Sequence, residues 1–245
     1  MTQFFVLAKD IIMDKAIIRG EEAKHLIRVL RKKLGDHLRL FDGSGQIYNG
    51  EIEKINERIV QAKILSRLVV DERKTKIHLY QSLLKSLRMD SCVEKVTQLG
   101  IEEITPVISE RTVVCLNPEK VKEKIFHWQK IALQAAKQSD CVKLPTINFP
   151  IDLIQAFKRL KNTDLNFIFW EKEKKSNLKE VFSTLNSKPE TINLFIGPEG
   201  GFSDKEISLA KTYGLVPVGL KGYILRSETA AIVAASIVLY ERKEL

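Results

Sequence analysis

The fold of this chain is decided at Leu194-Phe195-Ile196-Gly197-Pro198-Glu199-Gly200-Gly201-Phe202-Ser203, where an apolar strand ends in a turn that holds three glycines. Glycine lets the backbone adopt positive φ angles and approach a ligand closely, and the proline fixes one dihedral angle of the turn. Ser203 and Glu206 have the spacing of a capping box, which predicts a helix from Asp204 to Tyr213. A strand, a glycine turn and a capped helix together predict the floor of a ligand pocket in an α/β sheet.

A second motif follows at Ile224-Leu225-Arg226-Ser227-Glu228-Thr229-Ala230, again where an apolar strand stops. The first turn lacks the Gly-Lys-Ser/Thr ending of a P-loop, and its glycines do not have the Gly-x-Gly-x-x-Gly spacing of a dinucleotide site. The two common nucleotide-binding motifs are therefore excluded. An ordinary tight turn between strand and helix remains an alternative for the glycine pair taken alone.

Strands alternate with helices in the last two thirds of the chain. Apolar strands are expected at 77–84, 103–108, 166–170, 192–196 and 215–220. Helices are expected at 89–99, 118–138, 153–160, 178–186, 204–213 and 228–242. This alternation predicts a mostly parallel sheet with helices on both faces. The last helix is apolar around most of its circumference, which predicts burial in the core or against another subunit.

Short strands dominate the first third of the chain. The charged run Asp71-Glu72-Arg73-Lys74-Thr75 separates this β-rich part from the part in which strands and helices alternate. Strands are expected at 4–7, 16–18, 37–41, 47–55 and 59–68, with a turn at 42–45 joining two of them as a hairpin. One helix, from Glu21 to Lys32, interrupts them. The boundary predicts a β-rich domain at 1–70 and an α/β domain at 75–245.

The charge of the chain points to a polyanionic partner. Its 245 residues carry a net charge of +9, with 44% hydrophobic and 29% charged residues, as in a globular protein. Six cations and one acid lie between Lys24 and Arg39. The apolar residues of the expected helix recur at helical spacing, so its basic side chains fall largely on other faces, free to contact phosphate. A merely solvated basic surface is the alternative.

Cysteine and histidine spacing predicts no metal site. The three cysteines, Cys92, Cys115 and Cys141, form no Cys-x-x-Cys pair, and the four histidines have no ligand spacing. The apolar run at 4–8 is too short for a signal peptide or a membrane span, so a cytoplasmic protein is expected.

Five ordered blocks resemble the RsmE family, the 16S ribosomal RNA uridine N3-methyltransferases of the SPOUT class. Two of them are the motifs quoted above, at 196–203 and 225–230. The others are Leu26-Ile27-Arg28-Val29-Leu30-Arg31 with Gly35-Asp36 and 40–43, then 94–100 with 104–106 and 109–111, and then 128–132 with 135–136, 138–139 and 144–145. The resemblance spans nearly the whole chain.

The resemblance implies a PUA-like RNA-binding β-barrel followed by a SPOUT domain with a deep trefoil knot, acting as a homodimer on 16S rRNA of the small subunit. It also implies S-adenosylmethionine as the methyl donor, held by three loops. Carried over by position, the expected cofactor residues are Trp170, Glu171, Ile196, Gly197, Glu199, Gly200, Gly201, Leu220, Gly222, Ile224 and Leu225.

The chemistry implied is attack of uridine N3 on the methyl group, with negative charge spreading onto the uracil oxygens. Arg226 is the expected stabiliser of that charge, with a structural salt bridge to Glu228 or Glu199 as the alternative. Glu199 and Glu228 are the candidate bases or orienting groups. The expected RNA contacts are Lys24, Arg28, Arg31, Lys32, Lys33, Lys85, Arg88 and Arg111, and Lys95 is a further candidate. For Lys85, Arg88, Lys95 and Arg111, each taken alone, a solvated surface charge is the alternative.

The chain departs from the family pattern at two places. Lys221-Gly222-Tyr223 replaces a Gly-Pro-Arg sequence, and Lys137, Asp140 and Cys141 replace an acidic residue and a Gly-Arg pair. These changes bear on RNA contacts more than on donor binding. Two other functions stay open: methylation of a ribose 2′-hydroxyl or a transfer RNA by a related SPOUT enzyme, and RNA binding without catalysis.

Overall fold

A computed structural model of the chain describes residues 3–70, 73–184, 189–220 and 222–245. The chain divides into two compact units, one formed by residues 1–72 and 133–144 and the other by residues 73–132 and 145–245. Residues 133–144 were predicted to belong to the second domain, at 75–245. These residues end helix α3 (Val121–Ser139) and begin the segment after it, and Ala136 and Val142 pack with Phe41 of the first unit.

The first unit is built on a six-stranded sheet of order β1-β4-β5-β6-β3-β2. Its strands are β1 (Gln3–Phe5), β2 (Ile11–Ile12), β3 (Lys15–Arg19), β4 (His37–Phe41), β5 (Gln46–Ile55) and β6 (Ile59–Val69). The predicted hairpin joins β4 and β5, and its turn places Gly43 and Gly45 at positive φ. Buried side chains such as Leu26, Leu40 and Ile52 form the core of this unit.

The helix predicted from Glu21 to Lys32 is shorter in the structure. An α-helix, α1 (Gly20–Lys24), continues as one wider π turn (His25–Val29) and then ends. Arg31 lies in the left-handed region at φ 50°, and the Lys32 N–H donates to the Leu26 carbonyl at 3.0 Å. A left-handed residue followed by a bond back to the last turn is a common way to end a helix. The apolar spacing of the segment did not reveal this stop.

The second unit carries a seven-stranded sheet in which all pairs are parallel. Six strands run in the order β10-β8-β7-β12-β11-β13, and β9 pairs with β8. The strands are β7 (Lys76–Ser82), β8 (Glu103–Ile108), β9 (Thr146–Ile147), β10 (Ile151–Asp152), β11 (Leu165–Phe169), β12 (Thr191–Ile196) and β13 (Val216–Val218). The two-residue strands β9 and β10 were not predicted, because runs this short carry no periodic signal.

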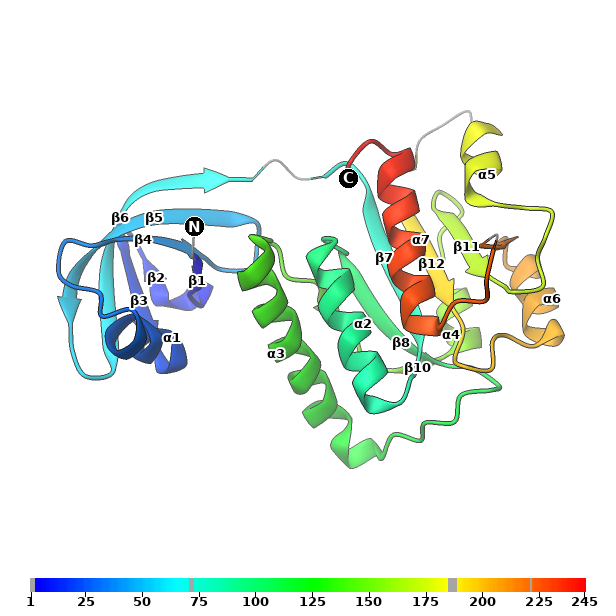
Figure 1. Cartoon of the computed structure of the whole chain (residues 1–245), viewed down its shortest axis with the longest axis horizontal. Coiled ribbons are helices and arrows are strands. Elements are labelled where there is room, and N and C mark those ends of the chain that lie inside the picture. Colours follow the sequence, from blue (N-terminus) through cyan, green and yellow to red (C-terminus); the bar gives the residue numbers. More distant parts are fainter. Residues whose placement is uncertain (1–2, 71–72, 185–188, 221) are drawn as a thin grey trace. The chain divides into compact units, whose positions relative to one another are not determined.

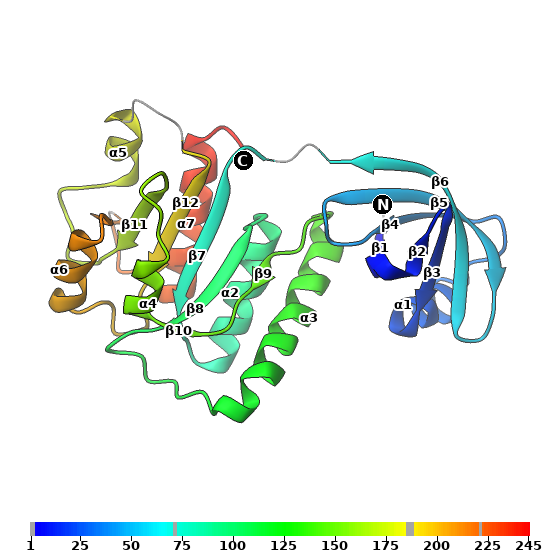
Figure 2. The ribbon, with the colours of Figure 1, turned by 180° about the vertical axis from the view of Figure 1, so that it is seen from behind.

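Helices cover both faces of this sheet, as the alternation predicted. Successive residues of a strand point to opposite faces, so Leu194 packs with α2 (Ser86–Gln98), α5 (Leu178–Thr184) and α7 (Ser227–Glu241), while Phe195 packs with α4 (Leu153–Lys158) and α6 (Asp204–Thr212). Figure 1 shows α2 and α7 in front of the sheet, and Figure 2 shows the opposite face with α4. Of the helix predicted at 178–186, residues 185–186 lie outside the described residues.

The last connection positions the site. Strand β13 lies at the edge of the sheet beside β11, yet α7 packs against α2 and against the central strand β12. Leu220 and residues 222–226, which are described residues of this connection, therefore lie at the carboxyl ends of β11 and β12. The trefoil knot stays a prediction, because Lys221 on this connection lies outside the described residues.

Candidate active site

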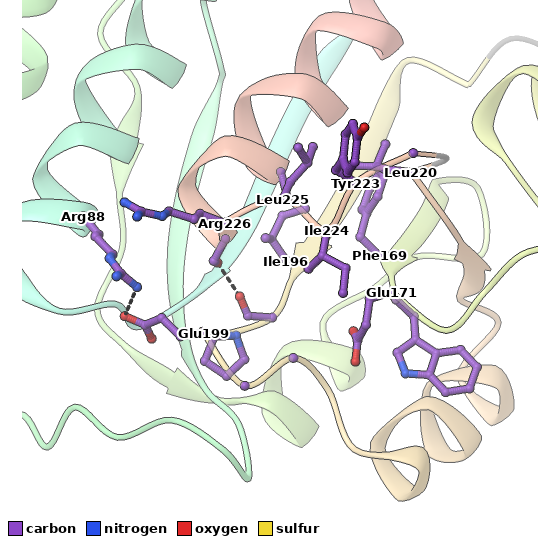
Figure 3. Close-up of a pocket in the computed structure, with 18 residues that line it drawn as sticks. Arg88, Phe169, Glu171, Ile196, Glu199, Leu220, Tyr223, Ile224, Leu225 and Arg226 are labelled. Carbon is purple, nitrogen blue, oxygen red and sulfur yellow. Dashed lines mark hydrogen bonds and ion pairs between the residues drawn. The ribbon is translucent and has the colours of Figure 1, made fainter.

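A pocket of about 460 Å³ lies where three loops follow β11, β12 and β13. All eleven residues predicted to hold the cofactor line it (Figure 3). The structure adds Arg88, Phe169, Pro198, Tyr223, Arg226, Ser227 and Ala230 to the lining. The carboxyl ends of adjacent parallel strands meet at one edge of a sheet, which is why loops far apart in the sequence converge here.

The glycine loop at 197–203 is held in one conformation by its own hydrogen bonds. The Gly201 N–H donates to the Pro198 carbonyl at 2.9 Å, and Gly201 has a φ of 66°. A side chain at Gly201 would meet the Glu171 carboxylate at 2.7 Å. The predicted capping box is confirmed, since the Ser203 hydroxyl accepts from the Glu206 N–H and the Glu206 carboxylate accepts from the Ser203 N–H.

A second turn, at 109–112, braces this loop from outside. The Arg111 guanidinium donates to the Gly200 carbonyl at 2.8 Å, and a Cβ at Gly200 would touch the Arg111 side chain at 3.4 Å. The Ser203 hydroxyl donates to the Glu110 carboxylate at 2.6 Å. Arg111, predicted as an RNA contact, therefore fixes the backbone of the glycine loop in this structure.

A buried hydrogen-bond chain connects the start of α7 with the centre of the unit. The Ser227 hydroxyl donates to the Gly197 carbonyl and accepts from the Gln81 side-chain amide at 2.9 Å. The Cys92 thiol lies 3.7 Å from the Gln81 amide oxygen, and burial raises the pKa of this thiol to about 12. Cys92 is thus a neutral core residue, and Ser227 couples the two loop motifs directly.

The charged groups of the pocket lie on two sides. Figure 3 shows Arg88, Glu199 and Arg226 on one side and Glu171 on the other. The Arg88 guanidinium lies 3.2 Å from the Glu199 carboxylate. Arg226 makes no ion pair and no side-chain hydrogen bond within the described part of the chain. The alternative, a salt bridge from Arg226 to Glu228 or Glu199, is therefore absent from the described part of the chain. Glu199 forms its ion pair with Arg88 instead.

Glu228 differs from the other predicted catalytic residues. It lies in the first turn of α7 and is not part of the pocket lining. One of its carboxylate oxygens is buried and has no hydrogen-bond partner in the described part of the chain. Negative charge in the first turn of a helix is favoured by the helix dipole. Glu228 thus sits behind the pocket wall rather than within it.

The predicted RNA contacts fall into two groups. Five lie in the first unit, where Arg28, Arg31 and Lys33 are exposed. The Lys24 ammonium lies 2.6 Å from the Glu21 carboxylate, and the Lys32 ammonium lies 3.9 Å from that of Asp36. The other three, Lys85, Arg88 and Arg111, lie in the second unit, close to the glycine loop.

Sequence reasoning missed the role of Arg88 in the pocket. Arg88 follows β7 in the first turn of α2, and no glycine or motif marks this strand end. Phe169, next to the predicted Trp170, and Ala230, at the end of the second motif, were not predicted because both look like ordinary core positions. Among the described residues, no cluster of three or more His, Cys, Asp or Glu side chains is arranged to hold a metal ion. None of the described helices combines the length and apolar character that crossing a bilayer requires.

Known proteins with this sequence pattern are RNA methyltransferases. A family profile described as an RNA methyltransferase domain matches residues 71–239, and one described as an RNA methyltransferase PUA domain matches residues 18–65. The chain is 32% identical to the ribosomal RNA small subunit methyltransferase E of Buchnera aphidicola subsp. Schizaphis graminum, over 91% of this chain and 89% of that protein. It is 29% identical to the protein of the same name from Bacillus subtilis, over 93% and 91%.

Solved structures agree over nearly the whole length. A methyltransferase of Legionella pneumophila, crystallised with bound cofactor SAM, is 32% identical and superposes with a TM-score of 0.86 over 98% of this chain and 97% of that chain. A ribosomal RNA small subunit methyltransferase E from Neisseria gonorrhoeae, bound to S-adenosyl methionine, is 26% identical with the same TM-score and the same coverage.

Proposed function

The chain belongs to the ribosomal RNA small subunit methyltransferase E family, and from that premise we propose that it methylates N3 of a uridine in 16S rRNA of the small subunit. It is an enzyme, and S-adenosylmethionine is its methyl donor. The observation that carries the proposal is the pocket itself. It combines the three predicted donor loops with an arginine, Arg226, that has no partner among the described residues.

The pocket fits S-adenosylmethionine in size and in chemistry. Its volume of about 460 Å³ lies within the range of small-molecule sites. Phe169, Ile196 and Leu225 provide apolar walls for an adenine ring. The Glu171 carboxylate has no partner in the described part of the chain and can accept hydrogen bonds from hydroxyl or ammonium groups. When bound, the donor supplies a methyl group already activated by its sulfonium charge.

The chain must then position the base and stabilise the charge that develops on it. Loss of the N3 proton places negative charge on the neighbouring uracil oxygens. The Arg226 guanidinium is planar and carries a fixed charge, so it can donate two hydrogen bonds to such oxygens. Since no other group occupies it, Arg226 loses no existing interaction when the base arrives.

Glu199 is the better placed of the two candidate carboxylates to receive the N3 proton. Arg88 contacts one of its oxygens and holds the side chain at the pocket, and the other oxygen has no partner within the described residues. Glu228 has no access to the pocket lining, so we assign it a positioning role at the start of α7. RNA contacts are proposed for the basic residues of the first unit and for Lys85.

Product analysis tests the reaction. Unmodified small ribosomal subunits are incubated with the wild-type chain and methyl-labelled S-adenosylmethionine, and the rRNA is digested to nucleosides and analysed by mass spectrometry. We expect one labelled nucleoside, 3-methyluridine. A label on a ribose 2′-hydroxyl, or label found only when transfer RNA is the substrate, would replace the proposed product. No transfer by a chain that also fails to bind the donor would indicate RNA binding without catalysis.

We also propose that the chain is a homodimer, formed in the cytoplasm, where its rRNA substrate is made. Helix α7 is apolar around most of its circumference. Leu87 at the start of α2 is 84% exposed and Tyr240 at the end of α7 is 71% exposed. Because α2 and α7 pack side by side, each of these groups adds exposed apolar area to the helix pair. Sedimentation is expected to give twice the chain mass of 28.0 kDa. Leu87→Glu should shift it toward one chain mass, and a monomeric wild type would contradict the proposal.

A further inference from the structure

The first unit exposes a short segment that combines cations with aliphatic side chains. We call residues 28–34 the basic tip. Val29, Leu30 and Leu34 are 70%, 39% and 64% exposed, and Arg28, Arg31 and Lys33 are exposed beside them. Aliphatic groups are usually found inside a protein, so three exposed ones beside three exposed cations need an explanation, above all Val29 and Leu34.

The basic tip is held in place by backbone hydrogen bonds at both ends. Toward its start, the Leu30 N–H donates to the His25 carbonyl at 3.0 Å, and in its middle the Lys32 N–H donates to the Leu26 carbonyl at 3.0 Å. At its end, the Gly35 N–H donates to the Ile52 carbonyl in β5 at 2.9 Å. Arg31 adopts the left-handed conformation, which costs a non-glycine residue free energy. The segment thus presents its side chains on a fixed backbone, so little ordering is needed when a partner binds.

The charge of the basic tip is not neutralised by its neighbours. Residues 28–34 contain four cations and no acid. Of the acids nearby in sequence, Glu21 pairs with Lys24 and Glu22 with Lys137. Asp36 accepts a hydrogen bond from the Lys33 backbone N–H at 2.9 Å and lies 3.9 Å from the Lys32 ammonium. Arg28 and Arg31 make no ion pair within the described residues.

We propose that the basic tip is an RNA wedge, in which Val29 and Leu34 pack against bases or riboses of rRNA while Arg28, Arg31 and Lys33 contact the flanking phosphates. The inference rests on the proposed function, because that function makes rRNA the partner. Phosphate contacts supply affinity, and small apolar side chains can enter between unstacked bases or lie in the wide, shallow minor groove of an RNA helix. The tip carries no aromatic ring, so base stacking of the usual kind is not available to it.

An anionic membrane would also attract cations and aliphatic groups, and the sequence of the tip favours RNA over it. Segments that lie in a membrane interface have a continuous apolar face, typically with Trp or Phe, opposite their cations. Here the tip holds three aliphatic residues and no aromatic ring, and the helix that leads into it ends at Leu30, so it has no extended apolar helix face. Cations on both sides of a few small aliphatic groups instead suit an RNA strand, in which phosphates flank each ribose and base.

The salt dependence of binding separates the two kinds of contact. Affinity for unmodified small ribosomal subunits is measured over a series of KCl concentrations for the wild type, Val29→Ser with Leu34→Ser, and Arg31→Gln with Lys33→Gln. The apolar variant is expected to bind about 10- to 100-fold more weakly, with an unchanged slope of log affinity against log salt. The cation variant is expected to lower the magnitude of that slope by about 1.5.

A matched control comes from β6 in the same unit, where Leu65 and Val69 are 51% and 76% exposed. Leu65→Ser with Val69→Ser removes the same residue types at similar exposure, and we expect its affinity to stay within about twofold of the wild type. Thermal unfolding confirms that each variant folds. Unchanged affinity of the Val29/Leu34 variant, or an equal loss in the control, would overturn the wedge.

Two further measurements keep the outcomes distinct. Binding to vesicles of equimolar phosphatidylglycerol and phosphatidylcholine that is lost in the Val29/Leu34 variant would replace RNA by a membrane and overturn the inference. Each variant is also titrated with S-adenosylmethionine, for which we expect wild-type affinity. If the wild type binds the donor and methylates rRNA while the Val29/Leu34 variant binds subunits normally, the wedge is contradicted and the proposed function stands. If the wild type does neither, the proposed function fails.

Discussion

Replacing Arg226 by alanine is expected to slow methyl transfer to small ribosomal subunits by about 100- to 1000-fold while S-adenosylmethionine affinity stays within about threefold. The reason is the position of its guanidinium. Arg226 lines the pocket and has no partner in the described part of the chain, so its removal breaks no bond of the folded protein. What is lost is the charge that stabilises the uracil oxygens as the N3 proton leaves. Single-turnover rates and calorimetry measure the two quantities separately.

Related substitutions sharpen this prediction. Arg226→Lys keeps the charge without the planar fork and should recover part of the rate. Glu199→Gln should slow the reaction, since an amide cannot accept the proton. Glu228→Gln, in the first turn of α7, makes the same change of carboxylate to amide at the other candidate. We expect this variant to retain most of the rate because Glu228 lies outside the pocket lining. A larger rate loss in Glu228→Gln than in Glu199→Gln would reverse the two assignments, and a normal rate in Arg226→Ala would exclude its role.

Replacing Gly219 by alanine is expected to destabilise the second unit by about 3 kcal/mol and to weaken S-adenosylmethionine binding more than about 100-fold. Gly219 is buried directly after β13, and its N–H donates to the Ser176 carbonyl at 3.0 Å. A Cβ at this position would collide with the carbonyl oxygen of Glu173. The Glu173 oxygen belongs to the backbone and cannot rotate away, so either the loop after β11 or the loop after β13 must move. Thermal unfolding and calorimetry with the donor provide the measurements.

Gly200→Ala is the matched control, because it adds the same methyl group to another pocket loop. There the added Cβ would lie 3.4 Å from Arg111, an ordinary contact at the edge of close packing. We expect stability within about 0.5 kcal/mol of the wild type and donor affinity within a few-fold. Wild-type donor affinity in Gly219→Ala would contradict the close approach of the loops after β11 and β13. Equal losses in both variants would mean that any added methyl group in these loops is harmful.

The sequence predicted the α/β domain well because its strands are continuous apolar runs bounded by glycines and charged residues. The predicted bounds of β8 agree with the structure, and those of β12 differ by a single residue at its start. The capping box at Ser203 was equally legible, since it depends on two side chains three residues apart. The helix expected to reach Lys32 was wrong at its end, because the stop depends on a left-handed residue with an ordinary side chain. Such a residue leaves no mark in the sequence pattern.

By itself, the sequence determined the family, most of the elements and the eleven lining residues predicted to hold the cofactor, since each of these depends on local spacing and on short motifs that stay together along the chain. Only the tertiary structure decided which charged groups meet. It paired Glu199 with Arg88, bound Arg111 to the Gly200 carbonyl and left Arg226 without a partner among the described residues. These pairings join residues about a hundred positions apart, and their choice depends on distances of a few ångströms between side chains. No spacing rule along a chain reports such distances, and they follow only once the sheet has brought its strand ends together.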